Sequence, residues 1–124
     1  MMSQAEMAKA FGYSPAVRAG GLLFCSGVFG SEPDGVVPVD PARQFRLAFE
    51  ALGELLAAEG CSPADLVELV SYHVRYPDPD LVGAFVTAKA AFLRGALPAW
   101  TAVGVAALGY PETLVEIRAV ARIR

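Results

Sequence analysis

The clearest alternation of apolar and polar positions lies in the last quarter of the chain. Residues 100–108 and 114–123 are rich in Val, Ile and small residues, and a glycine and a proline separate them. The sequence therefore predicts two strands joined by a short turn. Because side chains alternate between the faces of a strand, Glu116, Arg118 and Arg122 share one face. That face could be solvent-exposed, a subunit interface or a ligand pocket.

Two amphipathic helices precede this stretch. Asp40-Pro41 is a favourable helix start, with an N-cap acceptor followed by proline at the first helical position, and Gly60 is a plausible stop. Apolar residues recur in this segment at three- and four-residue spacings: Phe45, Phe49, Leu52, Leu55 and Leu56. A second helix is expected from the Pro and Asp residues at 77–80 to about Arg94. Both helices should cover a sheet with their apolar sides.

Further strands are expected before each helix. Residues 13–29 have the pattern of a hairpin that turns at a pair of glycines, and residues 66–76 alternate well in their second half. The predicted order is β-β-α-β-α-β-β, an α+β domain with both helices on one side of a mixed sheet, because crossovers are right-handed. We expect one domain over residues 13–124, preceded by a loose arm over residues 1–12.

The composition suggests self-association. The chain has 124 residues, of which 55% are hydrophobic, which is a high share for a domain with so large a surface relative to its volume. Burial of the uncovered sheet face in an oligomer would explain this share. The alternative is a chain whose many alanines inflate the hydrophobic fraction without consequence.

Charge and residue usage exclude several classes of function. The formal net charge of −3 argues against a general nucleic-acid binder. No apolar run approaches a membrane span and the first residues do not resemble a signal peptide, so we expect a cytoplasmic protein with no membrane partner. The two cysteines, Cys25 and Cys61, are expected to be free thiols. With His73 as the one histidine and no Cys-x-x-Cys, we expect no metal.

His73 itself allows two interpretations. It is the one side chain here that ordinarily titrates near neutral pH. Without a visible Cys, Ser or Asp partner, we interpret it as a partly buried sheet residue with a hydrogen-bond partner rather than as a catalytic group.

Four segments together resemble one known family. They are Tyr13-Ser-Pro-Ala-Val17, Gly21-Leu-Leu-Phe-Cys-Ser-Gly27, Pro98-Ala-Trp-Thr-Ala-Val103 and Leu114-Val-Glu-Ile-Arg-Ala-Val-Ala121. In order and spacing they are similar to the RidA family, also called YjgF or L-PSP. The resemblance implies a chorismate-mutase-like fold, a homotrimer with a central barrel, and clefts for a small-molecule ligand at the subunit interfaces.

The resemblance also implies an activity and a set of site residues. Family members hydrolyse reactive imines and enamines to a carbonyl compound and ammonia without a cofactor. The implied catalytic residue is Glu116, which would orient or activate water, and the implied substrate-binding residues are Tyr13, Ser26, Gly27 and Trp100. The alternatives are that Glu116 forms an ion pair with Arg118 or Arg122 across a subunit seam, and that Trp100 anchors the trimer interface.

Two positions depart from the family pattern. Trp100 stands where active members carry an arginine that grips the substrate carboxylate, and Val86 stands where many carry an asparagine. An indole cannot replace a cation, but it can stack on a flat ligand. We therefore expect hydrolysis of an imine or enamine that is bulkier, or less dependent on an α-carboxylate, than a simple 2-iminoalkanoate. Aminomuconate-type compounds are one example.

Two other functions compete with this hypothesis. The first is a non-catalytic trimer that binds a small ligand. The second, suggested by older names of the family, is a ribonuclease, and the acidic balance of the chain argues against it.

Overall fold

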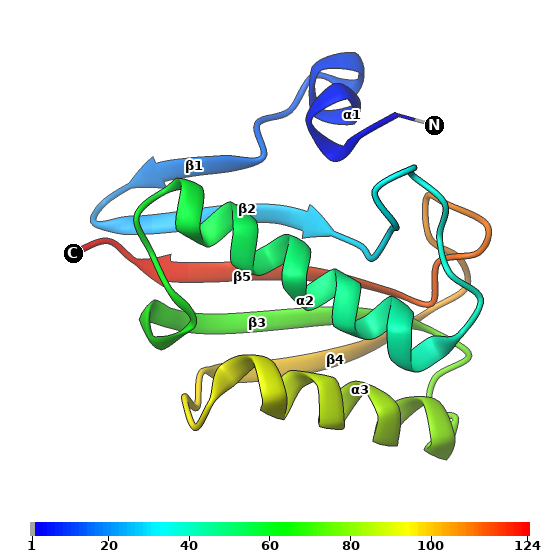
Figure 1. Ribbon diagram of the computed structural model, residues 1–124. Helices are drawn as coiled ribbons and strands as arrows, with labels where there is room; N and C mark the ends of the chain where they lie inside the picture. Colours follow the sequence, from blue (N-terminus) through cyan, green and yellow to red (C-terminus); the bar gives the residue numbers. More distant parts are fainter. Residues whose placement is uncertain (1) are drawn as a thin grey trace.

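A five-stranded sheet, with two helices packed on one face, forms the body of the protein (Figure 1). The computed structural model describes residues 2–124. Its elements are α1 (Gln4–Phe11), β1 (Ala16–Ala19), β2 (Leu22–Val28), α2 (Pro41–Ala58), the 3-10 turn η1 (Pro63–Asp65), β3 (Leu66–Val74), α3 (Pro79–Leu93), β4 (Ala99–Val105) and β5 (Val115–Arg122). From β1 onward the predicted order of strands and helices is confirmed.

The two long helices begin where their capping residues predict. The Asp40 carboxylate accepts the backbone N–H of Arg43 at the start of α2. At the start of α3, the Asp78 carboxylate accepts the N–H groups of Asp80 and Leu81. Each cap satisfies backbone donors that have no partner inside the helix.

The N-terminal segment differs from the expected loose arm. Residues 4–11 form α1, which begins with a capping box in which Ser3 and Glu6 hydrogen-bond each other's backbone N–H groups. It ends at Gly12, whose positive φ suits the left-handed conformation of a helix end. The prediction overlooked this local capping signal because α1 lacks a long apolar stripe.

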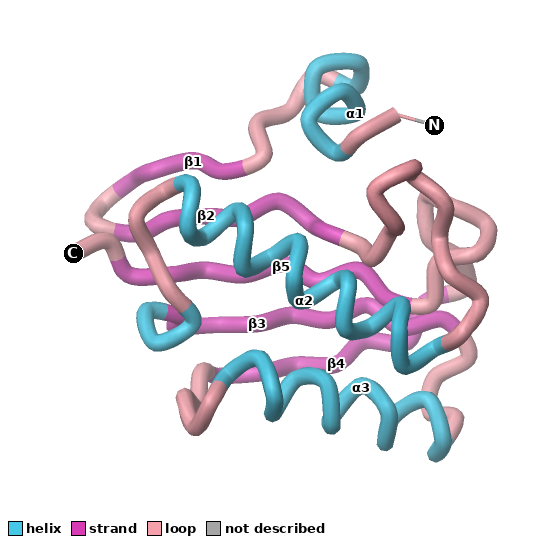
Figure 2. Tube along the Cα trace, viewed as in Figure 1, coloured by secondary structure: helices cyan, strands magenta, loops and turns pink. Residues whose placement is uncertain are grey.

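Strand β5 occupies the centre of the sheet. The strand order is β1-β2-β5-β3-β4 (Figure 2). Strand β5 is antiparallel to both β2 and β3, and β4 is parallel to β3 (Figure 1). The expectation that the last two strands pair with each other across a short turn is therefore wrong, because β3 lies between β4 and β5 in the sheet. The crossover through α3 places β4 at the edge, and residues 106–114 return the chain to the centre.

Alternation along β5 separates a covered face from an open one. Val115, Ile117, Ala119 and Ala121 are buried on the side of α2 and α3, whereas Arg118 and Arg122 are exposed and Glu116 is intermediate. The predicted common face of these three charged residues is confirmed. On the same open side, the apolar pair Val17 and Phe24 stays 52% and 41% exposed.

Cys25 and Cys61 are both buried and form no disulfide, as predicted. Within residues 2–124, no helix has the length and apolar character that crossing a bilayer requires. The same residues contain no group of three or more His, Cys, Asp and Glu side chains suited to a metal ion.

Replacing Phe49 with Ala should destabilise the fold strongly. The Phe49 side chain is 2% exposed, and its ring centroid lies 5.3 Å from that of Phe85 and 5.1 Å from that of Phe92. We expect a loss of about 3–5 kcal/mol in the free energy of unfolding, measured by urea denaturation at a fixed chain concentration. Val39→Ala is the control, because Val39 is 88% exposed. A loss below about 1 kcal/mol for Phe49→Ala would contradict this account.

Candidate functional site

A β-bulge in β2 lies at the centre of the candidate site. Cys25 pairs with Ala119 and Val28 with Ile117, so Ser26 and Gly27 together face the single residue Arg118. Such a bulge bends a strand and redirects its side chains. The bulge therefore makes β2 irregular at Ser26 and Gly27, the two residues that the sequence analysis expected to bind a ligand.

Ser26 holds the segment that carries Tyr13. Its hydroxyl donates to the carbonyl oxygen of Ser14 at 2.7 Å, and its backbone N–H donates to that of Pro15 at 2.9 Å. Tyr13 follows the left-handed end of α1 and is 43% exposed. The bulge and the Tyr13 segment are therefore fixed to each other by two hydrogen bonds.

Gly27 allows the Glu116 carboxylate to lie against the backbone of β2. A Cβ atom at position 27 would lie 2.5 Å from Glu116 Oε2 and 2.8 Å from its carboxyl carbon, so any side chain there would displace the carboxylate. Gly27 thus positions Glu116 through the absence of a side chain. The expected contact of its backbone amide with a ligand stays a prediction.

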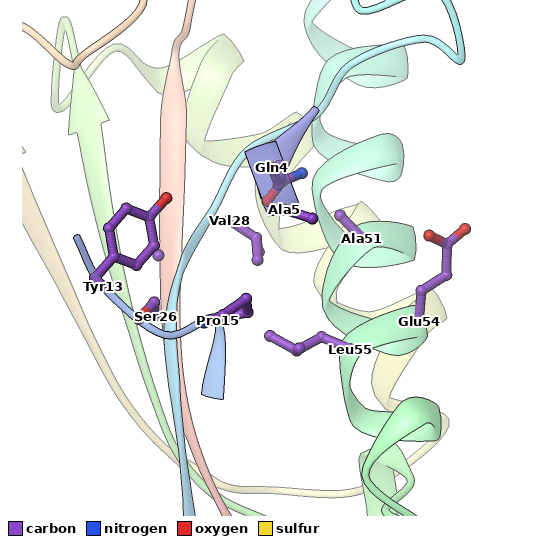
Figure 3. A pocket seen from close by; sticks show the side chains of 10 residues that line it. Gln4, Ala5, Tyr13, Pro15, Ser26, Val28, Ala51, Glu54 and Leu55 are labelled. Carbon is purple, nitrogen blue, oxygen red and sulfur yellow. The ribbon is translucent and has the colours of Figure 1, made fainter. Parts of the chain in front are cut away.

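Two cavities meet at Tyr13, Gln4 and Gly27. The outer cavity, of about 310 Å³, lies between α1, the Ser26 segment and α2 (Figure 3). The second, of about 360 Å³, contains Glu116 and is called the Glu116 cavity below. The Gln4 side chain donates a 3.1 Å hydrogen bond from Nε2 to the carbonyl of Phe29, and thereby fastens α1 beside both cavities.

The Glu116 cavity is mostly apolar. Met7 and Phe11 of α1 line it, together with the rings of Phe29 and Tyr110, whose centroids lie 5.1 Å apart and whose planes are tilted by 39°. No Lys, Arg or His is among its described lining residues. A ligand in this cavity would meet aromatic and aliphatic surface with Glu116 as the one ionisable carboxylate.

Glu116 has no ion-pair partner within residues 2–124. Within the same chain, Arg118 Nη2 lies 3.4 Å from Glu68 Oε1. The expected alternative, a pair of Glu116 with Arg118 or Arg122 across a subunit seam, stays a prediction. Burial raises the pKa of the Glu116 carboxyl above its usual range, since removal from water disfavours the charged form. A carboxyl group in this state can exchange protons with a bound molecule closer to neutral pH.

Trp100 lies apart from this group within one chain. Its Nε1 donates to Ser71 Oγ at 2.9 Å, and Ser71 is fully buried on the helix side of β3. Glu116 pairs with Tyr72, the next residue along β3, whose side chain points to the opposite face. The structure thus brings together Tyr13, Ser26, Gly27 and Glu116, and places Trp100 on the other side of the sheet.

Trp100 is fixed in a polar and aromatic cluster. Lys89 Nζ lies 4.1 Å from the indole centroid, a cation–π arrangement, and the Phe85 ring lies 6.1 Å away. The indole is 38% exposed at the edge strand β4. It therefore offers a rigid, partly accessible aromatic surface.

His73 is a buried sheet residue, as predicted. It is 5% exposed, its Nε2 lies 2.7 Å from Ser71 Oγ, and burial lowers the pKa of its imidazole. Its ring packs edge-on against Phe85 with centroids 4.6 Å apart. It supports the Ser71 hydroxyl that holds Trp100.

Sequence reasoning missed two residues near the Glu116 cavity. Gln44 of α2 is fully buried, and its Nε2 donates to the carbonyls of Pro38 and Glu112, at 3.1 and 3.2 Å. The N–H of Leu114 donates to Gln44 Oε1 at 2.6 Å. Thr113, between these two backbone contacts, lines the cavity and is 3% exposed. No motif marked either residue, because their roles arise from contacts distant in sequence.

Comparison with known families gives a match over nearly the whole chain. A family model described as "Endoribonuclease L-PSP" matches residues 3–123. The matched range includes the bulge, Trp100, the outer cavity, and all lining residues of the Glu116 cavity except Met2.

Individual relatives agree with this match. The RutC family protein YjgH of Escherichia coli (strain K12) is 40% identical over 111 residues, covering 90% of this chain and 82% of that protein. A 2-iminobutanoate/2-iminopropanoate deaminase of Rattus norvegicus is 34% identical over 112 residues, covering 88% and 78%. The crystal structure of Rv2704 from Mycobacterium tuberculosis, a member of the YjgF/YER057c/UK114 family, has a TM-score of 0.82 at 32% identity, covering 98% and 95%.

Replacing Glu116 with Gln should stabilise the protein more at pH 7 than at pH 4. Because the pKa of Glu116 is raised in the folded state, the unfolded chain ionises first as the pH increases, and the folded protein loses stability until its own pKa is passed. Glutamine removes this loss. We therefore expect a higher midpoint of thermal unfolding than wild type at pH 7, and a gain that shrinks towards pH 4.

The control for this measurement is Glu50→Gln, at an exposed carboxylate of α2. It should give no pH-dependent gain of this kind. A gain for Glu116→Gln that is the same at both pH values would contradict the burial of an ionisable group.

Proposed function

Because the chain belongs to the RidA family, also called YjgF or L-PSP, we propose that it hydrolyses a reactive imine or enamine to a carbonyl compound and ammonia. The observation that carries the proposal is Glu116, a half-buried carboxylate without an ion-pair partner in residues 2–124, beside an apolar cavity of about 360 Å³. The deaminase relative at 34% identity supports the same class of reaction.

Glu116 can serve as the proton carrier in each step. As a water oxygen bonds to the imine carbon, the C=N π electrons move to nitrogen, and Glu116 passes the proton lost by water to that nitrogen. In the resulting carbinolamine, Glu116 moves the hydroxyl proton to nitrogen as the C–N bond breaks. One imine and one water thus give one carbonyl compound and one ammonia, and Glu116 ends as it began.

An enamine needs one additional step. The protonated form of Glu116 first donates to the β-carbon, which converts the enamine into an iminium ion that water can attack. Burial favours this protonated form, since it raises the pKa of the carboxyl group.

The charges around the cavity favour a substrate without a carboxylate at the reacting carbon. The described lining residues include no cation, and an ionised Glu116 would repel a second carboxylate. Trp100, at the position where the family pattern has an arginine, would add an aromatic surface together with Lys89, whose Nζ lies 4.1 Å from the indole centroid. The same lack of cations and the net charge of −3 disfavour an RNA substrate, although the family description names an endoribonuclease.

We further propose a homotrimer in which adjacent subunits share each site. Trp100 and Glu116 lie on opposite faces of the sheet in one chain, so they can border one cleft if Trp100 comes from a neighbouring subunit. The open sheet face, with exposed Val17 and Phe24, supports self-association. Light scattering should then give three times the mass of one chain.

Replacing Glu116 with Gln should abolish most of the activity. Benzaldimine and 2-iminopropanoate can be generated in situ by flavin-dependent oxidation of benzylamine and alanine, and carbonyl formation followed above the uncatalysed background. We expect wild type to prefer benzaldimine, and Glu116→Gln to lower the rate by a factor of about 10²–10⁴. Glu50→Gln, at an exposed position, should retain the wild-type rate. Equal background rates for wild type and Glu116→Gln would leave only the ligand-binding trimer.

Mixing two inactive variants tests the shared site. If Trp100→Ala and Glu116→Gln each impair activity, heterotrimers formed by unfolding and refolding a mixture will contain some sites with both wild-type residues. We expect partial recovery of the benzaldimine rate in the mixture but not in either variant refolded alone. Failure to recover activity, in a mixture shown to contain heterotrimers, would contradict the shared site.

A further inference from the structure

The buried side chain of Thr113 lacks a hydrogen-bond partner. Its Oγ1 is the one buried side-chain nitrogen or oxygen in residues 2–124 that has no hydrogen-bond partner. A buried hydroxyl without a partner destabilises the folded state by roughly 1–3 kcal/mol. Such a group in a well-packed domain calls for a physical explanation.

The surroundings of Thr113 point to a ligand. Thr113 lines the Glu116 cavity together with Tyr110 and Phe29, three positions before Glu116 itself. Its side chain is therefore placed at the boundary of a space large enough for a small molecule. The oxygen itself is buried, so its contact with a ligand requires a turn of about 120° about χ1, which exchanges the hydroxyl with another substituent of Cβ.

The backbone of Thr113 is held on both sides. The Gln44 amide bonds the carbonyl of Glu112 and the N–H of Leu114, and the N–H of Thr113 donates to the carbonyl of Tyr110 at 3.1 Å. The fully buried Gln44 side chain thus joins α2 to the segment before β5. The Thr113 side chain is consequently displayed from a fixed backbone, which reduces the entropy lost when a ligand binds.

We infer that the Thr113 hydroxyl binds the nitrogen end of a planar, carboxylate-free imine in the Glu116 cavity. The ligand's apolar body packs against Phe29 and Tyr110 on one side and against Met7 and Phe11 of α1 on the other. The nitrogen end has N–H donors, which Thr113 Oγ1 and the Glu116 carboxylate can both accept. This inference names a contact for the substrate class proposed above and rests on that proposal for its catalytic meaning.

Benzamidine is a suitable probe, because it is a stable, planar, cationic analogue of a protonated imine with an aromatic body. Benzoate has the same shape with a negative charge. Isothermal titration calorimetry should show wild type binding benzamidine and discriminating against benzoate at least tenfold. Thr113→Val, which exchanges the hydroxyl for a methyl of similar size, should weaken benzamidine binding about five- to tenfold. Thr113→Ser should bind within about twofold of wild type.

The stability of the unliganded variants separates a ligand contact from a structural role. Because the Thr113 hydroxyl has no protein partner, Thr113→Val should leave the midpoint of thermal unfolding unchanged or raise it. The matched control is Thr87→Val on the exposed surface of α3, which should bind benzamidine like wild type.

Three results would overturn the inference. They are unchanged benzamidine affinity in Thr113→Val, a lower unfolding midpoint of that variant without ligand, and no binding of benzamidine by wild type at millimolar concentration. None of these measurements requires turnover. A protein that binds benzamidine through Thr113 but releases no ammonia would contradict the proposed hydrolysis and leave the binding site standing.

Discussion

The strict alternation of side chains along β5 is the constraint on which the rest of the structure depends. As the central strand, β5 must bury Val115, Ile117 and the two following odd-numbered alanines under α2 and α3. A strand has only two faces, so the even-numbered positions emerge on the side that the helices leave open. Glu116 is thereby directed towards the Gly27 bulge and held at a fixed depth. The burial of apolar side chains that stabilises the core therefore also determines the position of Glu116.

Much of the fold follows from local signals. The carboxylates of Asp40 and Asp78 accept backbone N–H groups two or three residues later at the helix starts, so the local sequence is sufficient to predict these caps. The position of β4 depends on a different kind of information. Its parallel pairing with β3 depends on the crossover through α3 and on which edge of the sheet is free. The sequence does not decide this, because β4 and β5, which are consecutive in the chain, could also have been neighbours in the sheet.

The candidate site was predictable in part. Family resemblance pointed to Tyr13, Ser26, Gly27, Glu116 and Trp100, and the fold of one chain brings together all of these except Trp100. The contacts of these residues could not be predicted from the sequence. The Ser26 hydroxyl donates to the carbonyl of Ser14, next to Tyr13, and the Trp100 indole donates to Ser71 on the helix side of the sheet. No motif marks Thr113 or Gln44, since a missing hydrogen bond and a contact between residues 70 positions apart are properties of the folded molecule alone.

The close approach between position 27 and the carboxylate of Glu116 has an evolutionary consequence. With 2.5 Å between Oε2 and the site of a Cβ atom, the glycine is required only while a long acidic side chain occupies position 116. A lineage that replaced the acid with a small residue would be free to gain a side chain at position 27. A later return of the acid would then place its carboxylate elsewhere, so the two positions should change together in descent.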